Sequence, residues 1–473
     1  MYIFGIFIGD FKYIIFLCVN FLNYFYSDFL CCILHYSHDM IYYIEIIFMK
    51  HYFYNQHILL SKWLQYIQFI CSKNMRNNIS RVVYIAKKLK ILNISSFIIT
   101  VSGTNGKGST CALLEKILLD SGYTVGKYSS PHLFNYYERI KINGSYIINP
   151  LIHISIFKKI LSVCKDIKFS YFEFITLAAL LIFQSSNLDV IILEVGLGGR
   201  LDATNVIIPH LAIVTNIGLD HIHELGDSRY LIGYEKSGIF RKNVIVCIGE
   251  NNIPYSVYQV ANFSNVSLYR IQYEWNYFQS NNNWYFYDQN GIVKNLPIPK
   301  ISLSSAAITI AALRVLKLNI KKKNIIQSLK KVFLPGRFHI IHRYPLIILD
   351  AAHNAHATYY LYQQLKNFLN QKKNIKIYGL FGILSRKDIK NTVLNLKELI
   401  HCWYYTSLQT YDSATEYILK EILPNSALFY PSVQNAIYQL MQRVQKKDLI
   451  LVFGSFVSVA EAITSIRSIY FQL

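Results

Sequence analysis

The chain of 473 residues lacks several features that would assign it to a functional class directly. None of its eight cysteines forms a C-x-x-C pair or follows a zinc spacing, so neither a zinc module nor a dithiol redox site is expected. Most of the cysteines stand in apolar runs, which indicates small core residues in a reducing, cytoplasmic compartment. No internal repeat or low-complexity segment stands out.

Charged residues are scarce, at 16% of the chain, and acidic ones scarcer than basic ones, so that the formal net charge is +21. A basic balance can indicate a nucleic-acid partner. The basic residues are scattered, however, and the longest runs, Lys321–Lys323 and Lys372–Lys373, are short. We therefore expect compositional drift toward lysine and no nucleic-acid partner, with a surface that suits anionic substrates. The hydrophobic fraction of 53% is ample for the cores of two or three domains.

An uninterrupted apolar run of membrane-spanning length is also lacking. Residues 1–48 are apolar and aromatic, but polar residues interrupt every window of about 18–20 residues, at Asp10, Lys12, Asn20, Asn23 and Asp28. There is no basic leader region and no small-residue cleavage site, so a signal peptide is not expected. We interpret residues 1–48 as a spurious or dispensable extension, with Met49 as a plausible start. A weak membrane helix is the alternative.

The most informative stretch that is present runs from Phe97 to Thr110, FIITVSGTNGKGST. A β-rich apolar run leads into a glycine-rich loop, and the loop opens a helical pattern. This order predicts a phosphate-binding loop, in which backbone N–H groups and the helix N-terminus face an anion. Lys107 can neutralise the β- and γ-phosphates, and Ser109 can offer a hydroxyl to Mg²⁺. Gly108 separates Lys107 from Ser109, unlike the standard pattern, so a simple tight turn is the alternative.

Polar residues follow the next predicted strands, which cover Thr124–Tyr128, Asp189–Leu193 and Leu211–Thr215. Ser130 follows the first strand, Glu194 ends the second, and His221 follows the third. Ligands of open α/β sheets bind at the carboxyl ends of the strands, and a carboxylate at such an end commonly supports the metal of a nucleotide. A lone histidine is more often a structural residue than a ligand. His221, however, follows a strand end in the same sheet as Glu194, which favours a role as a ligand.

Strand-like segments follow, including Tyr269–Tyr277 and Trp284–Asp288, and the βα alternation restarts beyond Leu334–Phe338. The alternation predicts parallel, doubly wound α/β sheets. We expect three parts: the apolar extension 1–48, an ATP-binding domain over 49–334 and a smaller Rossmann-like domain over 338–473.

Nine motifs occur in a fixed order: SGTNGKGST, YSSPHL, YFEF, LEVGLGGRLDATN, TNIGLDH, EKSGIF, PGRF, LDAAHNAHA and LVFGSF. Together they resemble the folylpolyglutamate synthase/dihydrofolate synthase family, a branch of the Mur-ligase-like amide ligases, from about Leu59 to the end of the chain. The resemblance implies a Mur-ligase-like P-loop ATPase domain and a bifunctional bacterial enzyme. It would phosphorylate the carboxylate of dihydropteroate or a reduced folate with ATP, and L-glutamate would then displace the phosphate.

The resemblance also implies site residues, residue by residue. Its nucleotide contacts would be Asn105, Gly106, Lys107, Gly108, Ser305, Arg337, Asp350 and His353. The ligands of two Mg²⁺ ions would be Ser109, Ser130, Glu194 and His221. The pterin substrate would lie against Ser170, Tyr171, Phe172, Glu173, Leu201, Asp202 and Ala203. The catalytic set would be Lys107, His221 and a carbamylated Lys236. A monomer without a membrane partner is expected.

Some positions depart from the family pattern, and two other functions remain open. Ser305 replaces the usual asparagine, and NNIS before Arg81 lacks the family's glycine and glutamate. Asn354-Ala355-His356 replaces Asn-Pro-His.

A cell-wall Mur ligase would share the phosphate loop, Glu194, His221 and Lys236, but would not be expected to show LGGRLDATN and YSSPH. A non-catalytic nucleotide-binding or membrane-tethered relic is the third possibility.

Overall fold

The computed structural model describes residues 56–71, 78–165, 167–280, 283–316, 318–370 and 374–471. By the density of internal contacts the chain divides into two units, residues 1–66 and 67–473. A helix covers residues 56–70. The extension 1–48 lies outside the described residues. In the part of the chain that the structure describes, no helix is both long and apolar enough to cross a membrane.

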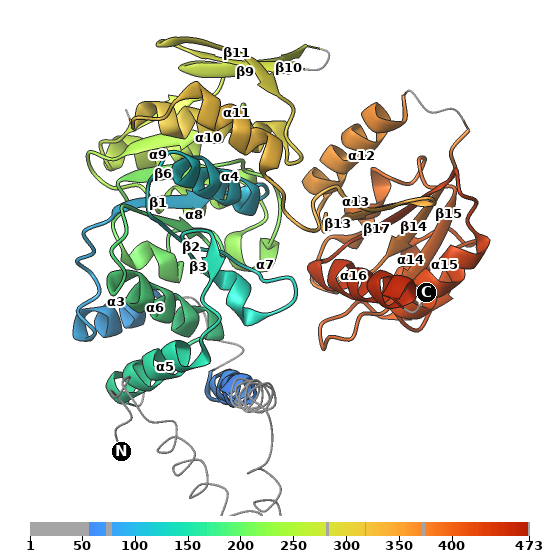
Figure 1. The fold of residues 1–473 in the computed structure, drawn as a ribbon, viewed down its shortest axis with the longest axis horizontal. Coiled ribbons are helices and arrows are strands. Elements are labelled where there is room, and N and C mark those ends of the chain that lie inside the picture. Colours follow the sequence, from blue (N-terminus) through green and yellow to red (C-terminus); the bar gives the residue numbers. More distant parts are fainter. Residues whose placement is uncertain are drawn as a thin grey trace, which may run out of the picture. The chain divides into compact units, whose positions relative to one another are not determined.

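The first sheet of the larger unit has eight strands in the order β4-β3-β2-β5-β1-β6-β7-β8. Figure 1 labels β1, β2, β3 and β6 of this sheet. Its strands are β1 (Phe97–Ser102), β2 (Val125–Tyr128), β3 (Ile140–Ile142), β4 (Ser145–Tyr146), β5 (Val190–Glu194), β6 (Leu211–Val214), β7 (Ile245–Ile248) and β8 (Ser267–Arg270). The strands from β2 to β8 in this order pair in parallel, while β3 and β4 are antiparallel. The glycine loop therefore leaves the middle of a parallel sheet.

Helices cover both faces of this sheet. The helices are α3 (Ile79–Lys88), α4 (Lys107–Asp120), α5 (Pro150–Cys164), α6 (Tyr171–Gln184), α7 (Ile222–Leu225), α8 (Arg229–Ser237), α9 (Tyr255–Phe263), α10 (Leu303–Val315) and α11 (Lys322–Lys331), with two 3₁₀ turns, η2 (Tyr136–Arg139) and η3 (Ala203–Val206). Helices α4, α10 and α11 share one hydrophobic core with β1, β5 and β6. Helices α8 and α9 form another core with β6 and β7.

A small antiparallel sheet, in the order β11-β10-β9, packs its buried aromatic residues into the core of α4 and α10. Its strands are β9 (Trp275–Ser280), β10 (Asn283–Asp288) and β11 (Gly291–Pro297). Trp275 and Trp284 are its largest buried side chains. Burial of each ring stabilises the fold by about 2–3 kcal/mol, so this sheet secures the helices behind the glycine loop.

The second large sheet has six strands in the order β12-β13-β17-β14-β15-β16. Its strands are β12 (His339–Arg343), β13 (Leu346–Asp350), β14 (Ile377–Phe381), β15 (Cys402–Thr406), β16 (Leu428–Tyr430) and β17 (Leu449–Phe453). All pairs are parallel except β12 with β13. Its helices are α12 (Ala355–Leu369), α13 (Ile389–Leu394), α14 (Glu416–Ile422), α15 (Val433–Arg443) and α16 (Phe456–Phe471).

Two separate cores lie on the two faces of the second sheet. One contains residues of α12, α13 and α14, and the other contains residues of α15 and α16. Strands buried on both faces by helices are what a doubly wound sheet requires. The prediction of an α/β fold with two parallel-rich, doubly wound sheets is therefore confirmed.

Candidate functional site

The glycine loop, residues 103–108, connects the buried strand β1 to the N-terminus of α4. Gly103 (φ +146°) and Gly106 (φ +81°) have backbone conformations that side chains rarely adopt. A Cβ on Gly103 would lie 1.8 Å from the Thr215 hydroxyl oxygen, which no side chain tolerates. The Lys107 ammonium donates to the carbonyl oxygens of Gly103 at 2.9 Å and Thr104 at 3.3 Å. The backbone conformation of the loop therefore requires glycine at positions 103 and 106. The carbonyl oxygens of the loop hold the Lys107 ammonium close to the loop itself.

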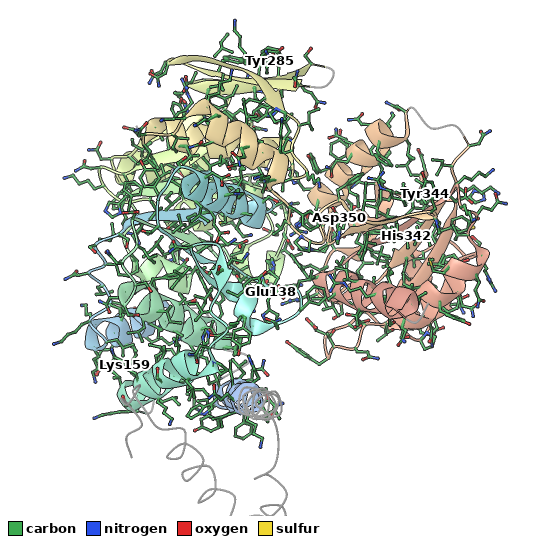
Figure 2. The ribbon with its side chains drawn as sticks, in the orientation of Figure 1. Glu138, Lys159, Tyr285, His342, Tyr344 and Asp350 are labelled. Carbon is green, nitrogen blue, oxygen red and sulfur yellow. The ribbon has the colours of Figure 1, made fainter. Side chains whose placement is uncertain are left out.

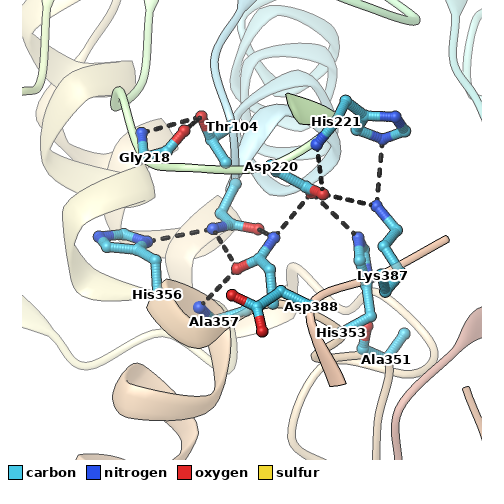
Figure 3. Close-up of polar contacts among 12 residues, drawn as sticks. Thr104, Gly218, Asp220, His221, Ala351, His353, His356, Ala357, Lys387 and Asp388 are labelled. Carbon is cyan, nitrogen blue, oxygen red and sulfur yellow. Dashed lines mark hydrogen bonds and ion pairs between the residues drawn. The ribbon is translucent and has the colours of Figure 1, made fainter. Parts of the chain in front are cut away.

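The segment after β6 fixes the shape of this loop. The Asn105 backbone N–H donates to Asn216 Oδ1 at 2.9 Å, and Asn216 Nδ2 donates back to the Asn105 carbonyl oxygen at 2.9 Å. The Thr104 hydroxyl donates to the Gly218 carbonyl at 3.1 Å and accepts from the Gly218 N–H at 3.0 Å (Figure 3). The two segments are therefore ordered together, and the loop does not depend on a ligand for its form.

Glu194 ends β5 beside the strand that carries the loop, since Val101 of β1 is its register partner. Its side chain is buried and accepts a hydrogen bond from the Ser130 N–H at 3.2 Å. A Cβ built on Gly108 would lie 3.4 Å from Glu194 Oε1, so the carboxylate adjoins the loop. Burial raises the pKa of Glu194, and the nearby Lys107 charge opposes that shift. The buried Glu194 carboxylate and the Ser109 hydroxyl line the same cavity, and oxygen donors of these kinds suit Mg²⁺.

His221 follows β6 in a left-handed conformation (φ 52°), which is uncommon for a residue other than glycine. Its Nε2 lies 3.1 Å from the Lys387 ammonium (Figure 3). Burial, with the Lys387 charge, lowers the pKa of His221 to about 3. The ring is therefore neutral at pH 7, with Nε2 facing the ammonium as a hydrogen-bond acceptor.

Asp220, the residue before His221, binds several donors from the second sheet's loops. Its Oδ1 accepts from Lys387 at 2.7 Å, and its Oδ2 accepts from Asn354 Nδ2 at 2.9 Å and lies 3.5 Å from His353 Nε2 (Figure 3). Burial alone would raise the pKa of Asp220, but the hydrogen bond with His353 and the neighbouring positive charges lower it. Asp220 is therefore an anion that links the two sheets' loops.

Lys236 lies in the last turn of α8 and is 3% exposed. Burial, with the Lys107 charge, lowers the pKa of Lys236 to about 7, against the opposing influence of Asp220 and Asp202. Its ammonium donates no hydrogen bond to any residue that the structure describes. A lysine with such a pKa is partly neutral at physiological pH and can act as a nucleophile.

The segment Ser170–Glu173 begins α6 as a capping box, in which Ser170 and Glu173 hydrogen-bond each other's backbone N–H. Glu173 is 2% exposed, and both its oxygens accept from Arg81, the shortest distance being 2.7 Å. Tyr171 and Phe172 line the cavity described below. The carboxylate of Glu173 is thus engaged by Arg81, whereas the two rings lie at the cavity, with Arg139 over Tyr171 at 5.8 Å and Tyr128 near Phe172 at 6.0 Å between ring centroids.

The turn after Glu194 places Asp202 as the N-cap of η3, where its Oδ1 accepts from the Thr204 N–H at 3.0 Å and its Oδ2 from the Leu197 N–H at 2.9 Å. Burial raises the pKa of Asp202, although these hydrogen bonds oppose the shift. Asp202 and Ala203 line the cavity, while Leu201 is not among the lining residues.

Of the expected nucleotide contacts outside the glycine loop, some line the cavity and others do not. Arg337 lies over the Phe456 ring, with 4.7 Å between the guanidinium carbon and the ring centroid, and lines the cavity with His353. Asp350, labelled in Figure 2, ends β13. Its carboxylate accepts from the N–H groups of Phe338 at 2.7 Å and Ala352 at 2.9 Å. Ser305 is buried, and its hydroxyl lies 3.4 Å from the Gly106 carbonyl oxygen. Asp350 and Ser305 are absent from the cavity lining among the described residues.

A cavity of about 1250 Å³ connects these groups. Its lining includes the glycine loop, Ser109, Ser130, Glu194, His221 and Lys236. No group of three or more histidine, cysteine, aspartate or glutamate side chains within the described ranges is close enough to hold a metal unaided. A cation here would therefore need serine, a modified lysine, water or phosphate oxygens to complete its ligands.

Sequence reasoning gave no role to two polar pairs at this cavity. His132 Nδ1 accepts from Arg139 Nε at 2.8 Å, and burial, with the Arg139 charge, lowers the pKa of His132 to about 4. Lys387 contacts Asp220 and His221, as described above. Lys387 stands in the GILSRKDI stretch and Asp220 in the TNIGLDH motif, so the sequence did mark each of these segments as informative. Their pairing was not predictable because 167 residues separate them.

Two protein-family models match this chain. The Mur ligase middle domain matches residues 101–304, and the Mur ligase glutamate ligase domain matches residues 336–456. Among curated proteins, the dihydrofolate synthase/folylpolyglutamate synthase of Buchnera aphidicola subsp. Schizaphis graminum is 46% identical over 403 residues, 85% of this chain and 95% of the relative. The Escherichia coli protein of the same name is 41% identical and matches 85% of this chain and 94% of its own.

Solved structures agree with these matches. Escherichia coli FolC in complex with DHPP and ADP superposes with a TM-score of 0.84 at 40% identity, over 87% of this chain and 98% of that one. The Yersinia pestis bifunctional folylpolyglutamate synthase/dihydrofolate synthase, complexed with AMPPNP and a Mn ion, gives 0.82 at 39% identity over 86% and 98%. The chain therefore belongs to the dihydrofolate synthase/folylpolyglutamate synthase family of Mur ligases, which ligate glutamate to folates at the expense of ATP.

Proposed function

We propose that this chain joins L-glutamate to dihydropteroate, and further glutamates to reduced folates, through an acyl phosphate. An acceptor carboxylate oxygen would attack the γ-phosphorus of ATP, and the bond to the β,γ-bridging oxygen would break to release ADP. The glutamate amine, after losing its proton, would attack the acyl carbon and expel phosphate. The observation that carries this proposal is the convergence of the glycine loop, Glu194, His221 and Lys236 on one cavity.

The glycine loop is our candidate for the phosphates of ATP. The N–H groups of Gly106 and Gly108 and the N-terminus of α4 would bind the β- and γ-oxygens, and Asn105, whose own N–H is held by Asn216, stays a predicted contact. Lys107 would exchange its hydrogen bonds to the loop carbonyls for the γ-phosphoryl group. Because the loop is already braced by Asn216, little ordering is needed on binding, which favours the in-line geometry.

We assign Ser109 and Glu194 to one Mg²⁺, and Ser130 and His221 to a second. The first donor set fits because the buried Glu194 carboxylate adjoins the glycine loop, and Ser109 lines the same cavity. The residues of the second set also line this cavity, and the Lys387 ammonium already lies against His221 Nε2, where positive charge is therefore accepted. Bound Mg²⁺ would neutralise charge on the phosphoryl oxygens. The Mn ion of the Yersinia pestis complex supports a cation at this kind of site.

Lys236 is our candidate for carbamylation. With the pKa of Lys236 lowered to about 7, the ammonium can lose a proton to solvent, and the neutral amine can then attack CO₂. The N–C bond forms as one C=O π bond breaks and leaves its electron pair on oxygen, and the nitrogen releases a second proton to solvent. The product is an anion, which removes the repulsion between Lys236 and Lys107. A carbamate oxygen beside Asp220 could then orient a cation, whereas the bare ammonium would repel it.

The remaining assignments follow the family's motifs. Arg337, Asp350, His353 and Ser305 are assigned to the nucleotide. The rings of Tyr171 and Phe172 are our strongest candidates for the pterin, because they are the aromatic members of this set that line the cavity. Ser170, Glu173, Leu201, Asp202 and Ala203 stay predictions for the same substrate. The DHPP, ADP and L-glutamate bound to relatives support this substrate set. Domain bounds of 49–334 and 338–473, a monomer and a cytoplasmic location likewise stay predictions.

Acceptor specificity tests the proposal. We expect ATP-dependent phosphate release with dihydropteroate plus L-glutamate, and none with a UDP-muramoyl acceptor plus L-glutamate. The matched control is dihydropteroate with D-glutamate, which has the same charge and size but presents the amine in the other configuration. Release with the muramoyl acceptor alone would reject the folate assignment in favour of a cell-wall ligase.

A further inference from the structure

Lys387 carries a charge that the proposed reaction has not used. It lies in the loop after β14, and its side chain is 7% exposed. Its ammonium lies 2.7 Å from Asp220 Oδ1 and 3.1 Å from His221 Nε2 (Figure 3). The preceding residue, Arg386, has a side chain that is 49% exposed and approaches Asp412 at 3.4 Å. These two adjacent basic side chains thus have different environments: Arg386 is half exposed, and Lys387 is buried against Asp220 and His221.

The lone pair of an imidazole nitrogen can accept one hydrogen bond or bind one metal ion. In His221 the Nε2 atom faces the Lys387 ammonium, while Nδ1 lies 3.8 Å from Glu224. Asp220 is also occupied, since Asn354 and His353 approach its second oxygen. A cation that binds His221 through Nε2 must therefore displace the Lys387 ammonium from that atom.

We propose that Lys387 is a positioning residue, whose ammonium holds the His221 end of the second cation's site until that cation binds. The inference rests on the proposed assignment of His221 as a metal ligand. The ammonium supplies the positive charge that the Asp220–His221 pair requires, and it fixes the ring with Nε2 toward the cavity. When the cation binds, the hydrogen bond from Lys387 to His221 is lost, while the ion pair with Asp220 can persist. Cation binding is thus coupled to the release of a residue from the second sheet's loop.

Direct binding of Mn²⁺ tests this coupling without catalysis. Free Mn²⁺ would be measured by electron paramagnetic resonance in titrations of the full-length, nucleotide-free chain. We expect Lys387→Gln to bind the His221-dependent Mn²⁺ equivalent about tenfold more tightly or better, because a charged hydrogen bond no longer competes. Arg386→Gln, which removes an equal charge one residue away, should change this affinity less than about twofold, because exposed charges are screened.

Two further variants separate the possible failures. His221→Ala should lose one Mn²⁺ equivalent, and if none is lost in any background, both the ligand assignment and the coupling are wrong. If His221→Ala loses the equivalent but Lys387→Gln binds it no more tightly, only the coupling is wrong. Damage to the fold would weaken binding, opposite to the expected sign. Should Lys387→Gln fail to fold, Lys387→Met, which also lacks the charge, carries the same expectation.

Discussion

At the scale of single residues, Lys107 shows how the backbone prepares a charge for an anionic ligand. Its ammonium is held by two carbonyl oxygens of the loop that it is expected to serve. These neutral acceptors cost less to leave than a carboxylate would, because hydrogen bonds between ionic partners are roughly twice as strong. The lysine is thus held near the phosphate position without being neutralised by an ion pair.

We predict that Lys107→Ala lowers kcat for phosphate release at least about a hundredfold, as removal of one positioned charge stabiliser typically does. Thermal unfolding should change little, since the loop's shape depends on Asn216 and Thr104. The matched control is Lys159→Ala on α5, an exposed lysine outside the cavity lining (Figure 2). A Lys107→Ala enzyme with a near-normal rate would contradict the phosphate-loop assignment.

Lys236 should give a measurable pH signature. Its pKa is lowered from 10.5 to about 7, so between these pH values the unfolded chain holds a proton that the folded chain does not. The free energy of unfolding should therefore rise with pH in this window. The expected slope is about 1.4 kcal/mol per pH unit, relative to a variant without the amine.

Urea unfolding of wild type and Lys236→Met in CO₂-depleted buffer measures this slope as the difference between the two proteins. The contributions of the other titrating groups to the pH dependence are the same in both proteins and cancel in the difference. Parallel pH dependences would mean that Lys236 keeps an ordinary pKa in the folded state, and would remove the basis for carbamylation at neutral pH.

The residues that sequence alone could identify are those whose chemistry follows a strand directly. Glu194 and the glycine loop were found in this way, since the carboxyl ends of parallel strands meet at one edge of the sheet. The partners of His221 were not found. Its contact with Lys387 spans 166 residues, and no local pattern encodes such a pairing. Glu115 and Lys127, a buried ion pair between α4 and β2, were missed for a similar reason.

At the scale of elements, the link between α3 and α6 has two possible roles. Arg81 of α3 and Glu173 of α6 form a paired contact in which the glutamate side chain is 3% exposed. The family resemblance assigns Glu173 to substrate, whereas the hydrogen bonds make it a connection between two helices.

We predict that Glu173→Ala lowers stability by about 3 kcal/mol, because removing one partner leaves a largely buried guanidinium without its carboxylate. Urea unfolding measures this, with the exposed Glu398→Ala as control. If Glu173 also holds the pterin, the variant's KM for dihydropteroate should rise at temperatures where it is fully folded. An unchanged KM would limit Glu173 to the structural role, and unchanged stability would contradict the helix link.

The helices and strands around the loop were predictable because their apolar spacing is regular, and most bounds moved by one or two residues. Helix α4 begins at Lys107, inside the glycine loop, although its first turn is polar and gives no apolar signal. The single strand expected over Tyr269–Tyr277 was wrong. The structure ends β8 at Arg270 and starts β9 at Trp275, and Glu274 closes the turn by accepting from the Arg270 N–H at 2.6 Å.

At the scale of the whole molecule, the described part of the larger unit has two parallel sheets whose loops contribute to one cavity. The first contributes the glycine loop, Glu194 and His221, and the second contributes Arg337, His353 and Lys387. Such an arrangement can hold a nucleotide and a carboxylate together and exclude water from an acyl phosphate. The central claim is that the acceptor carboxylate itself receives the terminal phosphoryl group.

An isotope-transfer measurement tests that claim most directly. Dihydropteroate labelled with ¹⁸O in its carboxylate would be turned over with ATP and L-glutamate, and the released phosphate analysed by mass spectrometry. We predict one ¹⁸O atom in each phosphate, because the carboxylate oxygen that attacks phosphorus leaves with it when the amide forms. Release of unlabelled phosphate at the same rate as amide formation would contradict the acyl phosphate.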